Sequence, residues 1–587
     1  MKENFFTYRN IGGGYPAVEE DIRLGTPTAV FGVSEAHKYL LASLVQGKIL
    51  YITADAVSAG KAFASVSALS GRRCVQLCAK DEVILYKDAL SKDALYKRLT
   101  AIHAMLNGSD VVVADIEAVM QLFPAQIQSI TFKAGSDCEY ASVPQRLVSM
   151  GYTREYTVES KGTFAVRGDI LDVFPINCDN PMRIDFFGDT VERIRPYDSV
   201  SGERMETVES VCVISATDAY YDAADTAHVK EEVAKCLKSC ADSAAFRRAK
   251  AIAEELFAKM EGGAPFAGVS FVMPLLNCSR TIFEILPKDT QIIFDECKLI
   301  NDAVTGLYGE HTERVRELKK GGEAFAFGSN QIISPETLYN GFNGYRCAAL
   351  QTFASSTQFF RPLKTYNLNS SPAPSYLNAV TQLVTDVKNW LSNGYRILIF
   401  TGGLQRTERL SEILSDEYLP VYPVPDRLEA LHGVALTSEE LAHGLIIHES
   451  KLVIIGSSDL YTKAVTKRIR RRRGDMFTAP EIGDYAVHEK HGIGRITGTK
   501  KIETTDGIKE YVSIEYRGGD VLYVPVEQMD VLSKYVGEGS PSLSKIGGAE
   551  FDRVKERVKC SIRELAFDLK KLYAERGEKR GFRFRSE

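Results

Sequence analysis

The segment 30–39 has the outline of a phosphate-binding loop but lacks most of the side chains that such a loop requires. A working loop places glycines so that backbone N–H groups surround the phosphates, followed by Lys for charge and Ser or Thr for Mg²⁺. Gly32 and Lys38 stand at matching positions. The other key positions hold unsuitable residues, namely Glu35, His37 and Tyr39. Because a carboxylate at Glu35 would repel phosphate, the sequence predicts a degenerate turn that binds no nucleotide.

Two carboxylates follow an apolar strand later in the chain. Residues 291–294 read Gln-Ile-Ile-Phe, and Asp295 and Glu296 come directly after them. This is the form of a Walker B strand, whose carboxylate holds Mg²⁺ beside a bound nucleotide. Because no intact phosphate loop precedes it, we interpret the pair as a relic or as ordinary acids at a strand end.

Cysteines, histidines and overall charge narrow the class of protein further. The eleven cysteines include no Cys-x-x-Cys pair, and His488 and His491 have no further ligands at useful spacing, so we expect no metal site. We expect reduced thiols in a cytoplasmic protein. The apolar runs are too short for a membrane-spanning helix, and the N-terminus has no secretory signal. With a net charge of −5, contact with nucleic acid would require a local basic patch.

Short apolar runs alternate with helical patterns over the first 130 residues. We predict buried strands at 49–53 and 111–114 and helices at 34–46, 56–70 and 93–107. This alternation indicates an α/β fold, with a parallel sheet that has helices on both faces.

Changes in composition divide the whole chain into segments. The expected order is a first part of an α/β domain at 1–131, a β-rich insertion at 132–208, the second part of the α/β domain at 209–352, a linker rich in Ser, Thr, Pro and Asn at 353–376, a small α/β domain at 377–466 with strands at 396–401 and 452–456, a basic linker at 467–479, a small strand-rich domain at 480–538, and an amphipathic helix within 546–587.

One strand of the β-rich insertion could carry a binding surface. In the strand 183–187, Arg183, Asp185 and Phe187 share one face, and the two residues between them face the core. An exposed Arg beside a Phe is a combination enriched at interfaces. The alternative is that the arginines pair with nearby carboxylates on a solvated face and Phe187 folds against a neighbouring loop. The residues in that alternative are Arg167 and Arg183 with Asp169, Asp172 or Asp185.

A basic run separates the last two folded segments. It contains Lys467, Arg468, Arg470, Arg471, Arg472 and Arg473. These side chains could follow a DNA backbone, since each neutralised phosphate adds salt-sensitive affinity. No aromatic residues are interleaved, so base stacking is not indicated. The alternative is a solvated linker.

The segment 480–538 reads as a small β-barrel. Residues 511–516 and 521–526 alternate around a Gly-containing turn, which predicts a hairpin. Ile502 is an isolated apolar residue in a polar stretch, which favours either an interface or a buried position.

Specific motifs resemble a known family. The stretches 162–175 (Gly-Thr-Phe-Ala-Val-Arg-Gly-Asp-Ile-Leu-Asp-Val-Phe-Pro) and 181–189 resemble the inserted domain shared by UvrB and the bacterial transcription-repair coupling factors. The degenerate phosphate loop favours the coupling factors. The His-Gly-x-Gly motif at 491–494 and Leu-Tyr-Val-Pro-Val at 522–526 resemble the polymerase-interacting domain shared with CarD-type regulators. Leu-Tyr-Ala-Glu-Arg at 572–576 resembles the family's connecting helix.

The resemblance implies a multidomain α/β fold and an adaptor function in transcription-coupled nucleotide excision repair. It implies UvrA as a partner through Arg167, Arg183 and Phe187, and the RNA polymerase β subunit as a partner through Ile502 and Tyr523. In the family, ATP and Mg²⁺ serve motor domains that translocate on double-stranded DNA and follow the connecting helix. We expect this chain to lack the motor, to need no cofactor and to be a monomer.

Two other functions stay open from the residues alone. One is a UvrB-like ATPase that works through Lys38, Asp295 and Glu296, and it requires ATP binding that Lys38→Ala removes. The other is a free-standing CarD-like transcription regulator, and it requires the first 350 residues to be dispensable.

Overall fold

The computed structural model describes residues 11, 15–80, 92–198 and 203–461, apart from 239, 241, 267, 369 and 378, and residues 484–488, 492–504, 507–517, 520–525, 532–534 and 543–544. The chain divides into two compact units, and each is considered by itself. Unit 1 comprises residues 1–130, 145–152 and 212–468, and unit 2 comprises residues 131–144, 153–211 and 469–587.

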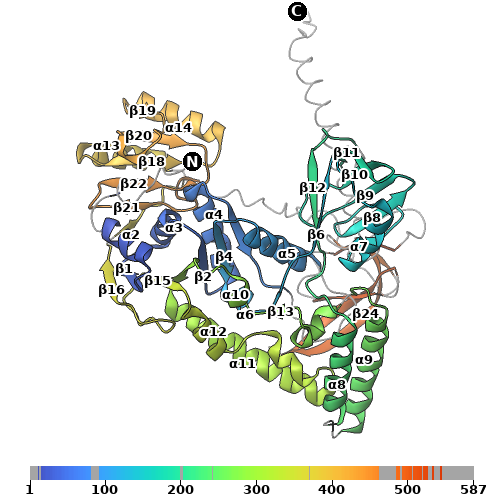
Figure 1. Cartoon of the computed structure of the whole chain (residues 1–587). Helices are drawn as coiled ribbons and strands as arrows, with labels where there is room; N and C mark the ends of the chain where they lie inside the picture. Colours follow the sequence, from blue (N-terminus) through green and yellow to red (C-terminus); the bar gives the residue numbers. More distant parts are fainter. Residues whose placement is uncertain are drawn as a thin grey trace, which may run out of the picture. The chain divides into compact units, whose positions relative to one another are not determined.

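A seven-stranded parallel sheet organises unit 1 (Figure 1). Its strands lie in the order β16-β1-β15-β14-β2-β4-β3, and every neighbouring pair is parallel. β2 and β14 are buried along their whole length, which explains their unbroken apolar runs. The strand bounds are β1 Thr28–Phe31, β2 Ile49–Thr53, β3 Cys74–Leu77, β4 Val111–Asp115, β14 Gln291–Asp295, β15 Arg346–Leu350 and β16 Lys364–Asn367.

The predicted α/β elements are confirmed. β2 and β4 occupy the two predicted strand positions, and three helices end within two residues of the predicted bounds. These helices are α3 Glu35–Leu44, α4 Ala56–Ser70 and α5 Lys92–Leu106. The start of α4 is fixed by Asp55, whose side chain accepts a hydrogen bond from the backbone of Ser58.

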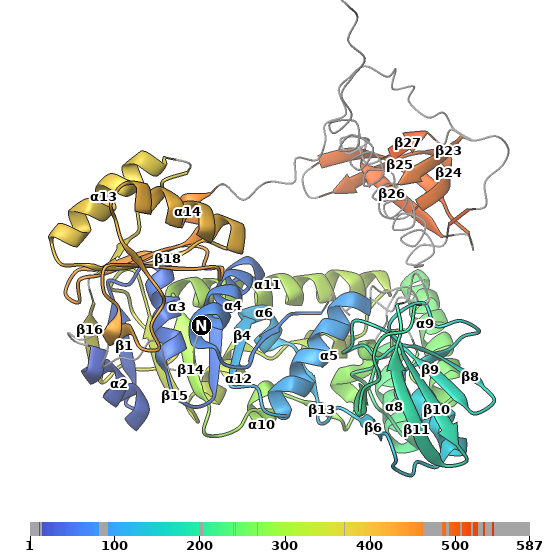
Figure 2. The same ribbon diagram turned by 90° about the horizontal axis from the view of Figure 1, so that it is seen from above.

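Helices cover both faces of the sheet (Figure 2). On one face, Leu50 and Ile52 of β2 belong to the same apolar cluster as residues of α5 and of α11 (Cys297–Gly321). On the other face, Ile49 and Tyr51 belong to a cluster with residues of α3 and α4. Successive side chains of one strand therefore supply two separate cores.

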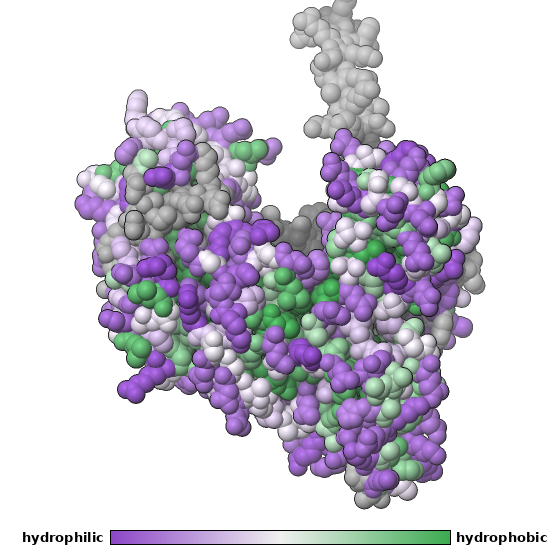
Figure 3. All heavy atoms as spheres, viewed as in Figure 1, coloured by the Kyte–Doolittle hydropathy of each residue, from purple (hydrophilic) through white to green (hydrophobic). Residues whose placement is uncertain are grey.

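Unit 1 contains further helices besides these. The bounds are α2 Tyr15–Leu24, α6 Ile116–Met120, α8 Ala223–Lys238, α9 Ser243–Glu261, α10 Ile282–Ile285 and α12 Pro335–Phe342. In the view of Figure 3, hydrophilic side chains dominate the surface, and apolar ones gather in the middle of the view.

The segment 353–376 differs from the linker that its composition predicts. Residues 364–367 form β16, which pairs in parallel with β1, Thr28 lying opposite Lys364. The strand was not predicted, because a segment rich in Ser, Thr, Pro and Asn is typical of a linker. In the part of the chain that the structure describes, β16 pairs with β1 alone and its side chains are mostly exposed, so it needs no apolar run.

A second, six-stranded sheet follows in unit 1. Its order is β17-β21-β22-β18-β20-β19, and β18 has parallel neighbours on both sides. Leu398 of β18 shares an apolar cluster with Val30 of β1, so the two sheets have a common core. The bounds are β17 Ser371–Pro372, α13 Val380–Ser392, β18 Arg396–Phe400, α14 Leu404–Asp416, β19 Val421–Tyr422, β20 Val434–Thr437, β21 Leu445–Ile447 and β22 Leu452–Ile455.

The predicted insertion forms a five-stranded sheet in unit 2. Its order is β11-β10-β9-β8-β7; β7 and β8 are parallel and the other pairs are antiparallel. Phe186 is buried against the rings of Phe132 and Tyr140. The bounds are β7 Thr153–Arg154, β8 Thr163–Arg167, β9 Ile170–Val173, β10 Met182–Phe187 and β11 Thr190–Pro196.

Unit 2 also contains an antiparallel sheet near the C-terminus, in the order β26-β25-β24-β23-β27. The predicted hairpin is confirmed, since Glu515 of β25 lies opposite Val521 of β26. Ile496, Ile514 and Tyr516 are part of its small apolar core. The bounds are β23 Tyr485–His488, β24 Gly492–Thr504, β25 Gly507–Glu515, β26 Val521–Pro525 and β27 Leu532–Lys534.

Two predicted segments lie outside the described residues: the basic run 467–473 and the amphipathic helix within 546–587. Whether that run contacts DNA stays a prediction. Among the helices that the structure describes, none has the length and apolar character needed to cross a membrane.

Gly494 should be essential to the core of the C-terminal sheet. A Cβ at this position would lie 2.5 Å from Ile514 Cγ2 and 3.0 Å from Tyr516 Cζ. Because overpacking of this kind costs about 1–3 kcal/mol, we predict that Gly494→Ala speeds amide hydrogen exchange in β24 and β25. The control is Gly306→Ala in α11, where an added Cβ would meet no atom within 4 Å. This substitution should stabilise the helix slightly, because Ala has a higher helix propensity than Gly. Unchanged protection in Gly494→Ala would contradict this account.

Candidate functional site

Lys38 reaches from α3 to the end of β14, where it contacts both predicted carboxylates. Its Nζ donates to Asp295 Oδ1 at 2.8 Å and to Glu296 Oε1 at 2.6 Å. The hydroxyl of Tyr51 donates to Asp295 Oδ2 at 2.8 Å, and the backbone N–H of Thr352 donates to Glu296 Oε1 at 2.7 Å. The structure thus brings together three of the four residues that the sequence assigned to a degenerate nucleotide site.

Because Lys38, Asp295 and Glu296 are largely buried, the pKa of each depends on the charges of the other two. The side chains of Lys38, Asp295 and Glu296 are 6%, 10% and 21% exposed. Burial alone would lower the pKa of Lys38, but the two carboxylates outweigh it and raise that pKa. Burial raises the pKa of Asp295 against the opposing effect of Lys38. At Glu296 burial is outweighed by hydrogen bonds from Lys38 and Thr352, and the pKa is lowered. Lys38 is therefore a charge already neutralised by protein groups.

The turn before Lys38 is also occupied by protein contacts. Gly32 adopts φ 73° there, and helix α3 begins at Glu35, so the backbone N–H of Lys38 donates to Ser34 O at 3.0 Å. His37 is buried between two hydroxyls, with Tyr15 OH 2.5 Å from Nε2 and Ser370 Oγ 2.7 Å from Nδ1.

Two side chains of this turn take part in further contacts. Burial lowers the pKa of His37 to about 3, so its ring is neutral. The hydroxyl of Tyr39 donates to Glu35 at 2.9 Å. These side chains stand where a phosphate loop would have glycine or a Mg²⁺ ligand.

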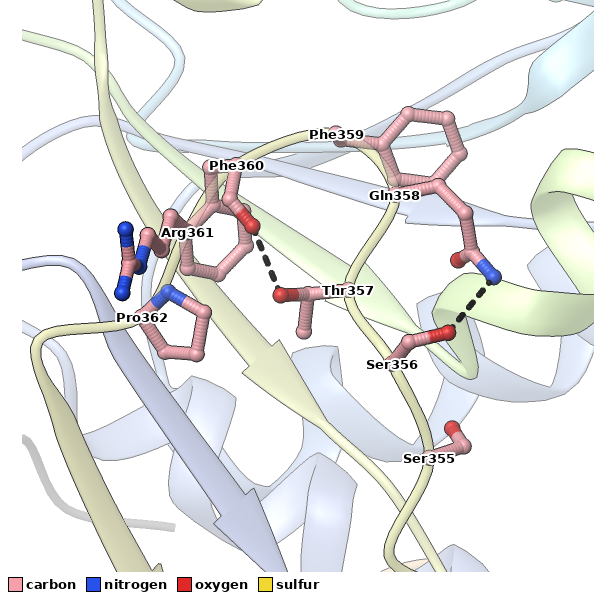
Figure 4. A pocket seen from close by; sticks show the side chains of 8 residues that line it. All are labelled: Ser355, Ser356, Thr357, Gln358, Phe359, Phe360, Arg361 and Pro362. Atoms are coloured by element: carbon pink, nitrogen blue, oxygen red, sulfur yellow. Dashed lines mark hydrogen bonds between the residues drawn. The ribbon is translucent and has the colours of Figure 1, made fainter.

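A separate pocket lies in the loop that follows β15 (Figure 4). It has a volume of about 500 Å³ and is lined by the eight residues 355–362. Thr357 Oγ1 donates to the carbonyl of Phe360 at 2.6 Å, and Gln358 Nε2 donates to Ser356 Oγ at 3.1 Å. Phe359 stacks on Phe294 with ring centroids 4.8 Å apart, which anchors the loop to the sheet. The sequence indicated no pocket here, because the composition read as a linker.

In the inserted sheet, Phe187 and Arg167 lie at the ends of adjacent hairpins. Phe187 is the last residue of β10 and is 81% exposed. Arg167 is the last residue of β8; it donates a hydrogen bond to the carbonyl of Tyr156 and its guanidinium lies 5.0 Å from the centre of that ring. The structure therefore places Phe187 in solvent rather than against a neighbouring loop. Tyr156 was not found from the sequence, because it stands in an irregular segment without periodicity.

Arg183 has a different environment from Phe187. Its Nε and Nη2 donate to the two carboxylate oxygens of Asp172 at 2.7 and 2.8 Å, and its guanidinium lies 5.6 Å from the ring centre of Tyr197. Asp172 is only 6% exposed at its side chain. The pairing alternative left open by the sequence thus holds for Arg183, which is half-buried. Beside this pair, Arg195 donates to Asp185 at 2.6 Å.

The two predicted polymerase contacts lie on different strands of the C-terminal sheet, with β25 between them. Ile502 is in β24, opposite Lys509 of β25. Tyr523 is in the edge strand β26, is 41% exposed, and has Lys500 Nζ 5.7 Å from its ring centre. His488 is buried, and His491 lies outside the described residues. In the part of the chain that the structure describes, no three His, Cys, Asp or Glu side chains group to hold a metal ion.

Family models identify two of the domains described above. Residues 130–219, which include the five-stranded sheet, match the UvrB interaction domain. Residues 481–536, which include the C-terminal antiparallel sheet, match the CarD-like/TRCF RID domain. The chain is thus a multidomain α/β protein that combines a repair-type and a transcription-type interaction domain.

Curated relatives give a more particular result. The chain is 27% identical over 577 residues to the transcription-repair-coupling factor of Bacillus subtilis, covering 93% of this chain and 48% of the relative. It is 26% identical over 480 residues to the transcription-repair-coupling factor of Staphylococcus aureus USA300, covering 78% of this chain and 40% of the relative. The resemblance to transcription-repair coupling factors is confirmed, and the chain spans about half or less of the length of these relatives.

Lys38 should act as a structural residue. Removing one partner from a buried ion pair costs about 3–5 kcal/mol, so we predict that Lys38→Ala lowers the free energy of unfolding by about 3 kcal/mol in urea titrations. The control is Lys61→Ala. Lys61 pairs with Glu35 at 3.4 Å while about half exposed, so its loss should change stability by less than about 0.5 kcal/mol. A Lys38→Ala protein that keeps its stability but loses measurable ATP binding would instead support the ATPase alternative.

Substitutions of Arg183 and Phe187, the two predicted binding residues on β10, should differ in their effect on the free energy of unfolding. Arg183→Ala leaves the nearly buried Asp172 without its bidentate partner, and we predict a loss of about 1–3 kcal/mol. Phe187→Ala removes a side chain that is 81% exposed and should change the free energy of unfolding by less than about 0.5 kcal/mol. Thermal unfolding of both variants checks this, and equal melting temperatures would contradict it.

Proposed function

We propose that this chain is an adaptor in transcription-coupled repair, which binds UvrA through the inserted sheet of unit 2 and the RNA polymerase β subunit through the C-terminal sheet. The observation that carries the proposal is the presence in one chain of a UvrB interaction domain and a CarD-like/TRCF RID domain, within a similarity to coupling factors that covers 93% of the chain.

The inserted sheet offers groups suited to a protein partner. Phe187 is a large aromatic side chain held in solvent at a hairpin end, and Arg167 lies exposed at the end of the neighbouring hairpin. Aromatic and Arg side chains dominate binding energy at protein interfaces. Arg183 supports this surface through its pair with Asp172 rather than as a free cation.

The C-terminal sheet supports a different mode of binding. Among the described strands of this sheet β26 lies at an edge, so one row of its backbone N–H and C=O groups faces away from them. Val521 and Tyr523 are 43% and 41% exposed, whereas Val524 is buried. A partner strand that pairs with this edge would gain main-chain hydrogen bonds and contacts with the alternate side chains.

The α/β part of unit 1 serves as a scaffold in this proposal. A UvrB-like ATPase would need Lys38 to contact nucleotide phosphates, but Lys38 is engaged by Asp295 and Glu296. ATP-driven translocation on double-stranded DNA, the activity expected of full-length coupling factors, is assigned to no site in this chain.

A pull-down tests polymerase binding. We predict that the full chain captures the polymerase β subunit and that Ile502→Arg and Tyr523→Ala reduce capture at least tenfold. Ile502→Val, which keeps an apolar β-branched side chain, is the control and should bind normally. Circular dichroism must show that Ile502→Arg keeps its strands. If the arginine variant unfolds the sheet, Ile502 is a core residue, and if wild type captures no β subunit, the transcription half of the proposal fails.

A further inference from the structure

One end of the inserted sheet is built from two hairpin turns held side by side. The β8–β9 turn contains Gly168, and the β10–β11 turn contains Gly188. The backbone N–H of Phe186 donates to Asp169 O at 2.8 Å. Tyr140 joins both turns, because its hydroxyl donates to Gly168 O at 2.6 Å and its backbone N–H donates to Asp189 Oδ1 at 3.0 Å. This end of the sheet is therefore a fixed surface.

Two exposed aromatic side chains stand on this end. Tyr156 is 87% exposed and Phe187 is 81% exposed. Tyr156 is held by Arg167, the residue before the first turn, through the contact of its guanidinium with the ring and through a hydrogen bond to the Tyr156 carbonyl. Cβ atoms added at Gly168 and Gly188 would meet no atom within 4 Å. Among the residues that the structure describes, no side chain therefore covers these two glycines.

Aromatic rings held in this way suit a protein interface. Burying one such ring removes about 150–250 Å² from water, and a side chain carried on a fixed backbone loses less conformational freedom on binding than one on a mobile segment. The guanidinium of Arg167 lies over the Tyr156 ring, and the hairpin with Gly188 at φ 61° fixes the backbone that carries Phe187.

The charges nearby favour a protein over nucleic acid. Glu155, Asp169 and Asp189 are exposed beside the aromatic residues, and the two aspartates lie within the two turns. Arg154 and Arg167 are exposed there too, so the charges are mixed rather than uniformly basic. These carboxylates would repel a phosphate backbone, whereas exposed aromatic residues with a basic stripe would be expected for single-stranded nucleic acid. A protein surface that offers apolar pockets rimmed by mixed charges is the complementary partner.

Arg183 does not belong to this set of exposed residues. It lies four residues before Phe187 on β10, is half-buried, and engages both oxygens of Asp172. It fixes β10 against β9 and thereby holds the hairpin that presents Phe187. Arg183 is therefore a positioning residue.

We propose that Tyr156 and Phe187 are paired aromatic anchors of the surface that docks UvrA, with Arg167 holding Tyr156 in place. This inference rests on the proposed function, and it adds Tyr156 as a contact and moves Arg183 out of the contact set.

Titration of the full chain with purified UvrA tests the proposal. Tyr156→Ala and Phe187→Ala should each weaken binding at least about 30-fold, the loss typical of an interface hot spot. Tyr156→Phe keeps the ring and should bind within about threefold of wild type. Tyr418→Ala in unit 1, where the Tyr is 94% exposed, is the matched control and should leave binding unchanged. Melting temperatures of all four variants should equal that of wild type.

The possible results distinguish the inference from the proposed function. If wild type fails to bind UvrA, the repair half of the proposed function fails. If wild type binds and Phe187→Ala weakens binding while Tyr156→Ala does not, the function stands and the role of Tyr156 is overturned. An Arg183→Ala protein that keeps its melting temperature but loses UvrA would overturn the positioning role. Binding of a labelled single-stranded oligonucleotide that depends on both aromatic residues would overturn the choice of a protein partner.

Discussion

The buried charge of Lys38 constrains the whole carboxyl edge of the main sheet. An ammonium group removed from water is tolerated only when carboxylates and further hydrogen bonds surround it. Here Asp295 and Glu296 supply the opposite charges, and they are held in turn by Tyr51 from β2 and by the backbone of Thr352 after β15. One cation thus fastens α3, β14, β2 and the end of β15. In a nucleotide-binding domain with this type of sheet, the phosphates of the ligand would supply part of the negative charge around the lysine. In this chain Asp295 and Glu296 supply that negative charge.

A second buried ion pair stabilises unit 1 where the chain returns from the insertion. Lys80 Nζ lies 2.5 Å from Asp218 Oδ2, with side chains 5% and 3% exposed. Burial alone would raise the pKa of Asp218, but Lys80 and the hydroxyl of Ser270 outweigh it, and the pKa is lowered. Residue 218 lies at the end of the segment that matches the UvrB interaction domain. A buried lysine paired with carboxylates therefore stabilises unit 1 both at the carboxyl edge of the main sheet and where the chain comes back from the insertion. In both places the opposite charges come from protein side chains.

The sequence predicts the regular elements well because their signals are local. Short unbroken apolar runs such as 49–53 are typical of strands buried on both faces, and the 3.6-residue pattern predicts the helices between them. The strand β16 was missed because an edge strand with exposed side chains carries no such pattern. At the sites, strand parity placed Arg183 and Phe187 on one face, but parity does not reveal whether a carboxylate lies opposite. Only the register of β9 with β10 shows that Asp172 faces Arg183. Tyr156 gave no signal at all, because its importance depends on Arg167, eleven residues away.

The two candidate docking surfaces use different physics, and this bears on how one chain could serve two partners. At the hairpin ends of the inserted sheet, the binding groups are aromatic side chains, so affinity would come from burial of apolar area. At β26, the available groups are mostly main-chain donors and acceptors, so affinity would come from strand pairing. A surface of the first kind depends on its aromatic side chains alone, whereas a surface of the second kind depends also on open access to the backbone of the edge strand. Because each surface is carried by its own small sheet with its own core, a change at one need not alter the other.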